Sequence, residues 1–302
     1  FQNNPNIVDK AGAKLLKQEV DFNYEILLID SSSNDNSIDS IKTDQRISLY
    51  TILQENFQHG KTRNLAVALS KGEFVAFLTQ DAIPYNKFWL KNIVKPLITD
   101  HNTCAVFGKH IAHKNHSFMT KNSIKNFFDK FEKPYKYRMD DDLTRYFSEI
   151  PSKRQFLHYY SDNNSCLRKS YWESFPYQDV DYGEDQMWAD WIIKCNKTKA
   201  FAHNAIVYHS HDYSKDEEFE RCYTEAKFFL KYFGYDLSQN RLELENGLED
   251  EAKKFINDYK NFYKKEKVNK KLHLDLIRMK REAYKLATDD MINEILKTKL
   301  KD

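Results

Sequence analysis

The chain has 302 residues, of which 41% are hydrophobic and 30% charged, so it is long enough for one large globular domain and an appendage. Its net charge of +2 gives no reason to expect a nucleic-acid partner. No signal peptide and no run long enough to cross a bilayer is recognisable, and none of the four cysteines forms a CxxC pair, so we expect a cytoplasmic protein with reduced thiols.

The N-terminal segment predicts a helix followed by a buried strand. Helical spacing of apolar residues covers 6–18, and the continuous apolar run YEILLI ends at Asp30. Open α/β sheets bind ligands at the carboxyl ends of their strands, so Asp30, with Ser32 in the following turn, is a candidate contact for a base or ribose. A purely loop-capping role explains Asp30 equally well.

This stretch, ILLIDSSSNDNS, resembles the second strand and acidic turn of family 2 glycosyltransferases, which have the GT-A fold. The resemblance implies an α/β domain over 1–214, with a mixed, mostly parallel sheet between helices, and a helical C-terminal extension over 215–302. In that family a first strand precedes the first helix and contacts the nucleotide. The sequence offers no counterpart, which leaves one side of the expected nucleotide pocket unaccounted for.

A basic segment then precedes a predicted helix. Residues 49–53 read as a short strand, Thr62 is the expected cap of a helix beginning near Arg63, and Gly72 ends it. His59, Lys61 and Arg63 lie near the helix start, which suits a diphosphate, although a solvated basic turn is the alternative. GKTRN resembles the Arg-Asn helix start of the family, which favours Arg63 as the nucleotide-binding cation.

The next buried strand, EFVAFL, runs into Thr79, Gln80 and Asp81. Glycosyltransferases of this fold carry an Asp-x-Asp motif here, and Thr79 replaces its first acid. Asp81, two phosphates, a histidine and waters can still complete an octahedral shell for Mg²⁺ or Mn²⁺. The run FQHGKTRNLA…GEFVAFLTQDAIP resembles the bacterial rhamnosyltransferase branch, which implies dTDP-L-rhamnose as donor and places Thr79 and Gln80 at the nucleotide.

Short polar residues follow the next predicted strand, over 156–160. They are Asp162, Asn163 and Asn164, and composition alone favours a turn. A similar Ser-x-x-Asn segment of the family lines the sugar and acceptor site, so the resemblance implies that role for all three. 

Two adjacent acids, Glu184 and Asp185, begin a predicted helix after Gly183. Acids at a helix start can simply favour the helix dipole. FPYQDVDYGEDQMWADW, however, resembles the Glu-Asp motif whose aspartate is the general base of inverting transferases. The resemblance implies that Asp185 is the base, and we expect Glu184 to contact the acceptor hydroxyl or to have an orienting role. Trp188, on the apolar face of the helix, is a candidate for the acceptor or sugar side.

Two histidines end the strand AIVY. Alternation with period two lets His209 and His211 point to the same side, and the family places a metal-binding histidine here. The resemblance therefore implies Asp81, His209 and His211 as metal ligands, although lone histidines are more often structural. Two decoys lie elsewhere: Asp140–Asp142 read as a helix start, and His110, His113 and His116 as surface or acceptor-side residues.

The C-terminal part reads as three helices, over 215–233, 242–263 and 272–300. Between Lys253 and Arg281 there are 11 Lys or Arg and three acids, a local excess of +8. Such a helix can bind anionic lipid, which would bring peripheral contact with the inner face of the membrane; a solvated face or a dimer contact explains it equally well.

These patterns together lead to one hypothesis. We expect an inverting, metal-dependent transfer of a sugar to a saccharide acceptor, free or lipid-linked, in bacterial surface polysaccharide synthesis. A related enzyme using a UDP-sugar, and a non-catalytic module that binds a sugar nucleotide or glycan, are the alternatives.

Overall fold

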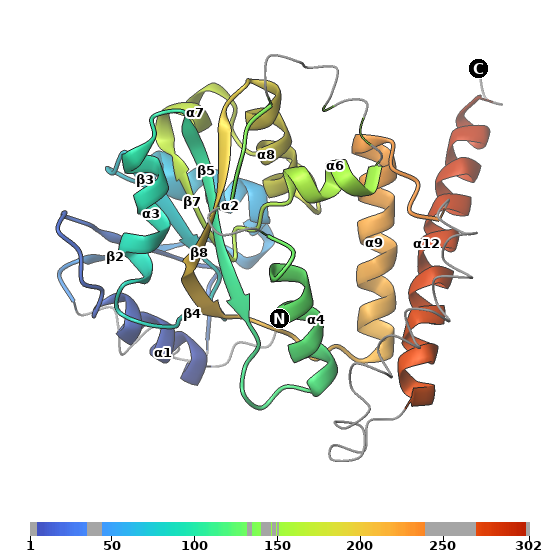
Figure 1. Cartoon of the computed structure of the whole chain (residues 1–302), viewed down its shortest axis with the longest axis horizontal. Coiled ribbons are helices and arrows are strands. Elements are labelled where there is room, and N and C mark those ends of the chain that lie inside the picture. Colours follow the sequence, from blue (N-terminus) through green and yellow to red (C-terminus); the bar gives the residue numbers. More distant parts are fainter. Residues whose placement is uncertain are drawn as a thin grey trace. The chain divides into compact units, whose positions relative to one another are not determined.

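The protein divides into two compact units, Phe1–Asp212 and Tyr213–Asp302. The computed structural model describes residues 5–34, 44–131, 135–139, 146, 149, 151–238 and 270–299. Figure 1 shows the sheet of the first unit with helices on both of its faces. The predicted class, a mixed α/β sheet between helices with a helical C-terminal part, is confirmed.

The main sheet of the first unit has six strands. Its order is β3 (Phe74–Leu78), β7 (Asn164–Arg168), β5 (Thr103–Ile111), β8 (Thr198–Tyr208) and β4 (Ile83–Pro84), and β6 (Tyr135–Tyr137) also pairs with β8. Only the β5–β8 pair is parallel, so this sheet contains more antiparallel pairing than the sequence suggested. β1 (Ile26–Asp30) and β2 (Ile47–Thr51) form a separate parallel pair.

Alternating residues of the strands contribute side chains to two hydrophobic clusters, because successive side chains of a strand point to opposite faces of the sheet. Val106 joins the cluster under α3 (Trp89–Thr99). Its neighbour Phe107 joins the cluster under three other helices, α2 (His59–Leu69), α4 (Phe118–Phe128) and α8 (Glu184–Lys194). The carboxylates predicted at the start of α8 therefore sit on a helix that is fixed by core packing.

A bulge bends the centre of the sheet. Gly108 pairs with Ala202 but Lys109 pairs with Ile206, so β8 carries extra residues here. Asn164 holds the bend: its amide donates to the carbonyls of Lys109 and Ala205, at 3.2 and 2.9 Å. A Cβ atom on Gly108 would lie 2.2 Å from the Asn164 amide nitrogen, so only glycine fits. The bend sets the direction in which β8 delivers His209.

Two local predictions were wrong. α2 begins at His59 and not near Arg63, because the side chain of Gln58, and not that of Thr62, accepts the hydrogen bond from the N–H of Lys61. Residues 151–158 form the helix α6 (Pro151–His158) where a strand was expected over 156–160, and proline suits the first position of a helix. The remaining short elements are α1 (Pro5–Leu15), η1 (Gln54–Asn56) and α7 (Lys169–Ser174).

The second unit contains α9 (Lys215–Phe233) and α12 (Lys270–Lys299). Ser214 and Glu217 form a capping box at the start of α9, and Gly234, with φ of 68°, ends it. Fully buried Ala283 and Ala287 lie on α12, where small side chains allow close helix packing. Among the described residues, no helix has both the length and the apolar character needed to cross a bilayer.

Candidate active site

An acidic pair stands at the N-terminus of α8. Gly183 precedes it with φ of 73°, a left-handed conformation that suits glycine and allows a tight entry into the helix. Glu184 and Asp185 then occupy the first turn, where the exposed N–H groups and the helix dipole favour negative charge. Glu184 is 4% exposed and Asp185 is half-buried, so the more accessible of the two is the expected base.

Arg63 of α2 joins this pair to a third carboxylate. Its guanidinium donates to Glu184 Oε1, and its Nε lies 3.4 Å from Asp162 Oδ2. Asp162 in turn uses its backbone N–H to donate to Asp185 Oδ2 at 3.2 Å. Three contacts and the peptide bond between Glu184 and Asp185 thus join the four residues in a ring, and Arg63 faces the carboxylates and not open solvent.

The charges and the burial of this ring raise the pKa of Asp185. Burial, followed by the negative charges of Glu184 and Asp162, raises the pKa of Asp185 to about 8, while the guanidinium of Arg63 opposes that rise. Burial also raises the pKa of Glu184 and that of Asp162, again against the effect of Arg63. A carboxylate with so high a proton affinity is suited to accept a proton from a hydroxyl group.

A second cluster lies at the ends of β3, β4 and β8. β4 pairs with β8 so that Ile83 is opposite Tyr208, which brings the preceding Asp81 next to the following His209. Asp81 Oδ2 lies 3.4 Å from His209 Nε2 and 3.1 Å from His211 Nε2. Burial alone would raise the pKa of Asp81, but hydrogen bonds from the two histidines outweigh burial and hold it below its ordinary value.

These three residues can hold a cation. One potential ligand atom of each lies within 4.8 Å of those of the other two, and they are the only such group of His, Cys, Asp and Glu in the described part of the chain. A carboxylate with two imidazoles is a donor set that fits a divalent transition metal. The side chains of Asp81, His209 and His211 are 26%, 11% and 31% exposed, which leaves the group accessible from solvent.

The loop that follows β5 supports the segment carrying the histidines. Ser210 Oγ accepts from the N–H of His113 at 2.9 Å and lies 2.7 Å from His116 Nδ1. Asp212 accepts from the backbone N–H and the hydroxyl of Ser117, at 2.7 and 3.0 Å, and from the hydroxyl of Thr120. The start of α4 is thus tied to the residues immediately after His209 and His211.

The residues expected on the nucleotide side occupy turns at strand ends. Asp30 is 9% exposed and accepts from the N–H of Ser33, which is the loop-capping contact considered above. Ser32, with φ of 61°, donates to the carbonyl of Ile52 at 2.8 Å. Thr79 accepts the N–H of Ala82 in the turn that carries Asp81, and Gln80 is exposed. Their role at a nucleotide remains a prediction.

The four residues assigned to the sugar and acceptor differ in accessibility. Asn163 is half-buried, whereas Asn164, Trp188 and Asp162 are at most 1% exposed. Asn164 accepts from Trp89 Nε1 and uses its amide to hold the sheet bend, and Trp188 donates to the carbonyl of Phe175. Burial favours structural roles for Asn164 and Trp188, because a sugar could reach neither without displacing its neighbours.

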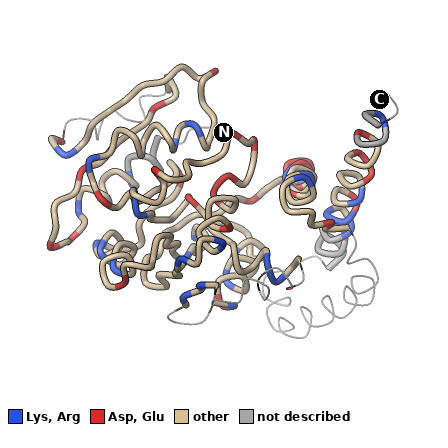
Figure 2. The backbone as a smooth tube through the Cα atoms, turned by 90° about the horizontal axis from the view of Figure 1, so that it is seen from above, with Lys and Arg blue, Asp and Glu red and all other residues tan. Residues whose placement is uncertain are grey.

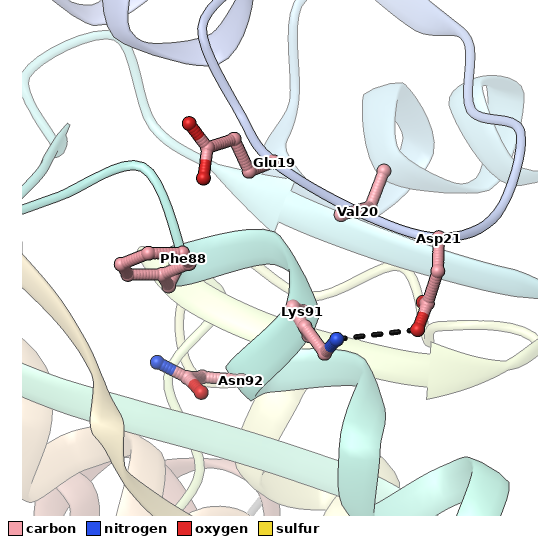
Figure 3. Close-up of a pocket in the computed structure, with 6 residues that line it drawn as sticks. All are labelled: Glu19, Val20, Asp21, Phe88, Lys91 and Asn92. Carbon is pink, nitrogen blue, oxygen red and sulfur yellow. Dashed lines mark hydrogen bonds and ion pairs between the residues drawn. The ribbon is translucent and has the colours of Figure 1, made fainter.

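A shallow groove lies apart from both clusters, beside the start of α3 (Figure 3). Its volume is about 440 Å³, and its lining shares no residue with either cluster: Glu19, Val20, Asp21, Phe88, Lys91 and Asn92. Lys91 is paired with Asp21 at 3.2 Å. The third charged residue of the lining, Glu19, is paired with Lys87 at 2.6 Å, so each charge of the groove already has a partner.

The other acidic and histidine groups that the sequence offered do not belong to either cluster. Asp140–Asp142 lie outside the described residues. His110 is buried against His209, with ring centres 5.1 Å apart, and burial holds its pKa well below the ordinary value, which keeps it neutral. His113 and His116 belong to the supporting loop. 

The sequence did not reveal the residues that bind the loop between α7 and α8, residues 175–183, to α2. Gln58 donates to the carbonyl of Val180, and Asn64 exchanges hydrogen bonds with the backbone of Tyr177, at 2.9 Å in both directions. A Cβ atom on Gly60 would lie 2.8 Å from the carbonyl oxygen of Gln178. The dense polar run QHGKTRN was the available signal, but it was assigned to a diphosphate.

Comparison with known proteins adds independent observations. The model of the Glycosyl transferase family 2 matches residues 1–162, which is more than half of the chain. That match includes Arg63, Asp81 and Asp162 but ends before Asp185 and the two histidines. The geometry above therefore carries the argument for the second half of the site.

Two curated relatives are O-antigen chain rhamnosyltransferases. RfbN of Salmonella typhimurium is 29% identical over 228 residues, covering 74% of this chain and 67% of RfbN. WbaN of Salmonella anatum is 31% identical over 208 residues, covering 68% of this chain and 62% of WbaN. The chain thus matches about two thirds of the length of these relatives.

Two solved structures have a fold similar to that of this chain. The mannosyltransferase PcManGT from Pyrobaculum calidifontis, solved with GDP-Man and Mn²⁺, gives a TM-score of 0.55 at 13% identity, covering 78% of this chain and 62% of that one. S. aureus TarS 1–349 gives 0.50 at 15% identity, covering 97% and 90%. At such identities the likeness establishes the fold alone.

Proposed function

Because this chain belongs to the Glycosyl transferase family 2, we propose that it transfers a sugar from a nucleotide donor to a saccharide hydroxyl in polysaccharide synthesis. The two rhamnosyltransferase relatives and the Thr79-Gln80-Asp81 sequence support L-rhamnose, from dTDP-rhamnose, as the transferred sugar. The observation that carries the proposal is the presence, in one unit, of a carboxylate cluster suited to proton abstraction and a carboxylate–histidine cluster suited to a cation.

Asp185 is proposed as the general base of an inverting reaction. It takes the proton of the acceptor hydroxyl while that oxygen attacks the anomeric carbon from the side opposite the leaving nucleotide, so the nucleotide departs as the new glycosidic bond forms. Its accessible position at the first turn of α8 and its raised pKa support this role. Glu184 lies deeper and is paired with Arg63, which supports an orienting role.

Asp81, His209 and His211 are proposed to hold a divalent cation. When bound, such an ion neutralises negative charge that develops on the leaving diphosphate. The hard carboxylate oxygen suits Mg²⁺ and Mn²⁺ alike, but two imidazole nitrogens favour Mn²⁺, because Mg²⁺ prefers oxygen ligands. Asp81 presents its oxygen from the turn after β3, and His211 is the more exposed of the two histidines.

The nucleotide is proposed to lie along the turns after β1 and β3. Asp30 and Ser32 close the first turn, and the backbone carbonyl of Thr79 closes the second, in which Gln80 is exposed. Ligand binding at the carboxyl ends of strands is the rule for open α/β sheets, which supports this placement. Asn163 is the half-buried residue among those assigned to the sugar and is the one retained for direct contact with it.

Membrane contact remains a prediction about the C-terminal part. Most of the basic segment from Lys253 onward, and the helix predicted over 242–263, lie outside the described residues. Along α12, basic and acidic residues alternate, as Figure 2 shows. A lipid-linked acceptor would be consistent with peripheral binding, and sedimentation of the chain with anionic vesicles tests it.

Donor hydrolysis and transfer assays test the function. The protein is incubated with dTDP-rhamnose, UDP-sugars and GDP-mannose, with Mn²⁺ or with a chelator, and release of nucleotide is measured. We expect turnover of dTDP-rhamnose that needs the cation, and stabilisation of the fold by dTDP exceeding that by UDP. Binding of nucleotide without turnover, on any donor and with a panel of acceptors, would instead support a non-catalytic binding module.

A further inference from the structure

Polar residues at the start of α2 bind the loop that leads to Asp185. Gln58 and Asn64 hold the carbonyls of Val180 and Tyr177, one from each side of the first helical turns. Between them Gly60 lets the backbone of the loop approach closely. Part of the surface of α2 on which a diphosphate was expected, at Gln58, Gly60 and Asn64, is therefore in contact with the loop between α7 and α8, residues 175–183.

Arg63 is held within this interface. Its side chain is 13% exposed and contacts Glu184, which is 5% exposed, and Asp162, which is fully buried. Asp162 is fixed on its other side by the hydroxyl of Ser165 at 2.5 Å. By contrast, the side chain of Lys61, two residues earlier on the same helix, is 60% exposed and pairs with Asp179, which is 66% exposed.

We propose that Arg63 is a positioning residue of the carboxylate cluster, and not a ligand of the donor diphosphate: through Glu184 and Asp162 it fixes where Asp185 stands and limits the negative charge around it. This inference rests on the proposed transfer reaction, in which Asp185 takes the acceptor proton. It assigns the segment from Gln58 to Asn64 to the acceptor side of the site.

The charge count supports this role. Three carboxylates face one guanidinium, so the cluster has an excess of two negative charges when every acid is ionised. The groups that face Asp185 or its ring of partners come from α2, α8, the start of β7 and the intervening loops: His59, Arg63, Tyr159, Tyr160, Asp162, Tyr177 and Glu184. Arg63 is the one permanent cation among them, so its loss leaves the acids without a counter-charge.

The shape of the side chain supports the role as well. A guanidinium offers several N–H donors in a fixed plane and can contact two carboxylates at once, whereas an ammonium group acts as a single point charge. Arg63→Lys therefore keeps the charge but loses one of the two contacts. A residue that only attracted a diphosphate would tolerate this change much better.

The first test separates the two roles by substitution and binding. Arg63→Lys and the control Lys71→Gln, an exposed lysine beyond the end of α2, are compared for dTDP affinity with Mn²⁺ and for kcat. We expect Arg63→Lys to keep its dTDP affinity within about twofold while kcat falls about tenfold to a hundredfold, because the base is misplaced. Lys71→Gln should leave kcat unchanged. A loss of dTDP affinity of about tenfold in Arg63→Lys, with kcat at saturation preserved, would overturn the proposal.

The second test reads the charge on Asp185. Removal of a cation raises the proton affinity of a neighbouring carboxylate, and removal of an acid lowers it. The acid limb of the kcat/KM profile should therefore move up by about one pH unit in Arg63→Gln and down in Glu184→Gln. Limbs that stay in place in both variants would contradict an electrostatic role.

The closing test needs no turnover, so it stays informative even if the proposed function fails. Arg63→Gln leaves two buried acids unpaired and is expected to lower the melting temperature by about 5 °C or more. Addition of Glu184→Gln removes one of those charges, and the double variant should recover at least about half of the loss. Additive losses in the double variant would refute the coupling, whereas absence of dTDP binding in the unaltered protein would refute the function alone.

Discussion

The two clusters of the first unit are built on opposite principles. In the carboxylate cluster, Glu184 and Asp162 are buried and already have a partner in Arg63, and only Asp185 is half-buried. In the other cluster, Asp81, His209 and His211 meet at a strand end and remain partly exposed. The comparison teaches that one cluster is preorganised by its own charges, whereas the other gathers ligand atoms around a position that a cation can fill.

Among the substitutions considered, Asp185→Asn in the carboxylate cluster should lower kcat the most. The amide cannot accept the acceptor proton, so we expect kcat to fall by about a thousandfold or more. The affinity for the nucleotide should stay within about threefold of that of the unaltered protein. Asp179→Asn, an exposed acid in the preceding loop, is the control and should retain full kcat. Normal turnover in Asp185→Asn would remove the base assignment.

The same variant has a stability signature with a defined sign. The pKa of Asp185, about 8 when folded, lies above its ordinary value of 3.8, so folding favours the protonated acid. This contribution is fully present below pH 4 and is lost as the pH rises through 8. Asp185→Asn avoids the loss, so its melting temperature at pH 9 should exceed that of the unaltered protein by about 5 °C, and the difference should vanish at pH 4.

Asp81→Asn should break the second cluster, and the effect should depend on the cation. The amide is a weaker ligand than the carboxylate, so we expect the thermal stabilisation by Mn²⁺ to be lost and kcat to fall about a hundredfold. Asp21→Asn, from the groove beside α3, is the control and should respond to Mn²⁺ as the unaltered protein does. Undiminished Mn²⁺ stabilisation in Asp81→Asn would place the cation elsewhere.

The pH dependence of the reaction sharpens the comparison further. Because burial and its acidic neighbours raise the pKa of Asp185 to about 8, the base is mostly protonated at pH 7 and becomes available above pH 8. We therefore expect kcat/KM to rise about tenfold for each pH unit below 8 and to level off above it, with Mn²⁺ held at saturation. A limb near pH 4 would mean that ligands or the cation reverse the effect of burial.

What the sequence could predict was local, and what it missed was tertiary. Gly183 before Glu184, and Gly234 after α9, punctuate the chain through left-handed conformations that glycine favours, and both helix ends were predicted. The pairing of Asp81 with His209 came from family resemblance, and the β4–β8 register supplies its physical reason. The fold class came from the same resemblance, and the apolar runs that alternate with helical segments agree with it.

What the sequence could not supply is burial, which cannot be read from a residue type. Asn164 was placed at the sugar by resemblance to a family segment and Trp188 by its position on the helix of the acidic pair; both side chains are fully buried and hold neighbouring backbone or side chains. Arg63 was assigned to a diphosphate because basic helix starts bind phosphate. Only the three-dimensional contact with Glu184, 121 residues away in the chain, indicates a different partner.

The smallest expected effect concerns the support of the metal cluster and not its ligands. Asp212 accepts from Ser117 and Thr120 and so ties the start of α4 to the segment after His211. Asp212→Ala should lower the free energy of unfolding by about 1 kcal/mol, which is comparable to the loss of a helix cap. It should also weaken Mn²⁺ binding a fewfold, because His211 is then less well oriented. Calorimetric titration with Mn²⁺ measures the affinity, and thermal unfolding in a chelator measures the stability.

Ser117→Ala provides the matched comparison for that last prediction. It removes the N-cap of α4, whose hydroxyl accepts from the N–H of Thr120, but leaves Asp212 able to accept from the Thr120 hydroxyl and the Ser117 N–H. Similar destabilisation with unchanged Mn²⁺ affinity in Ser117→Ala, beside weakened affinity in Asp212→Ala, would show that Asp212 orients the ligands. Equal Mn²⁺ affinity in both variants would mean that the histidines are held by β8 alone, and that the open cluster is as preorganised as the closed one.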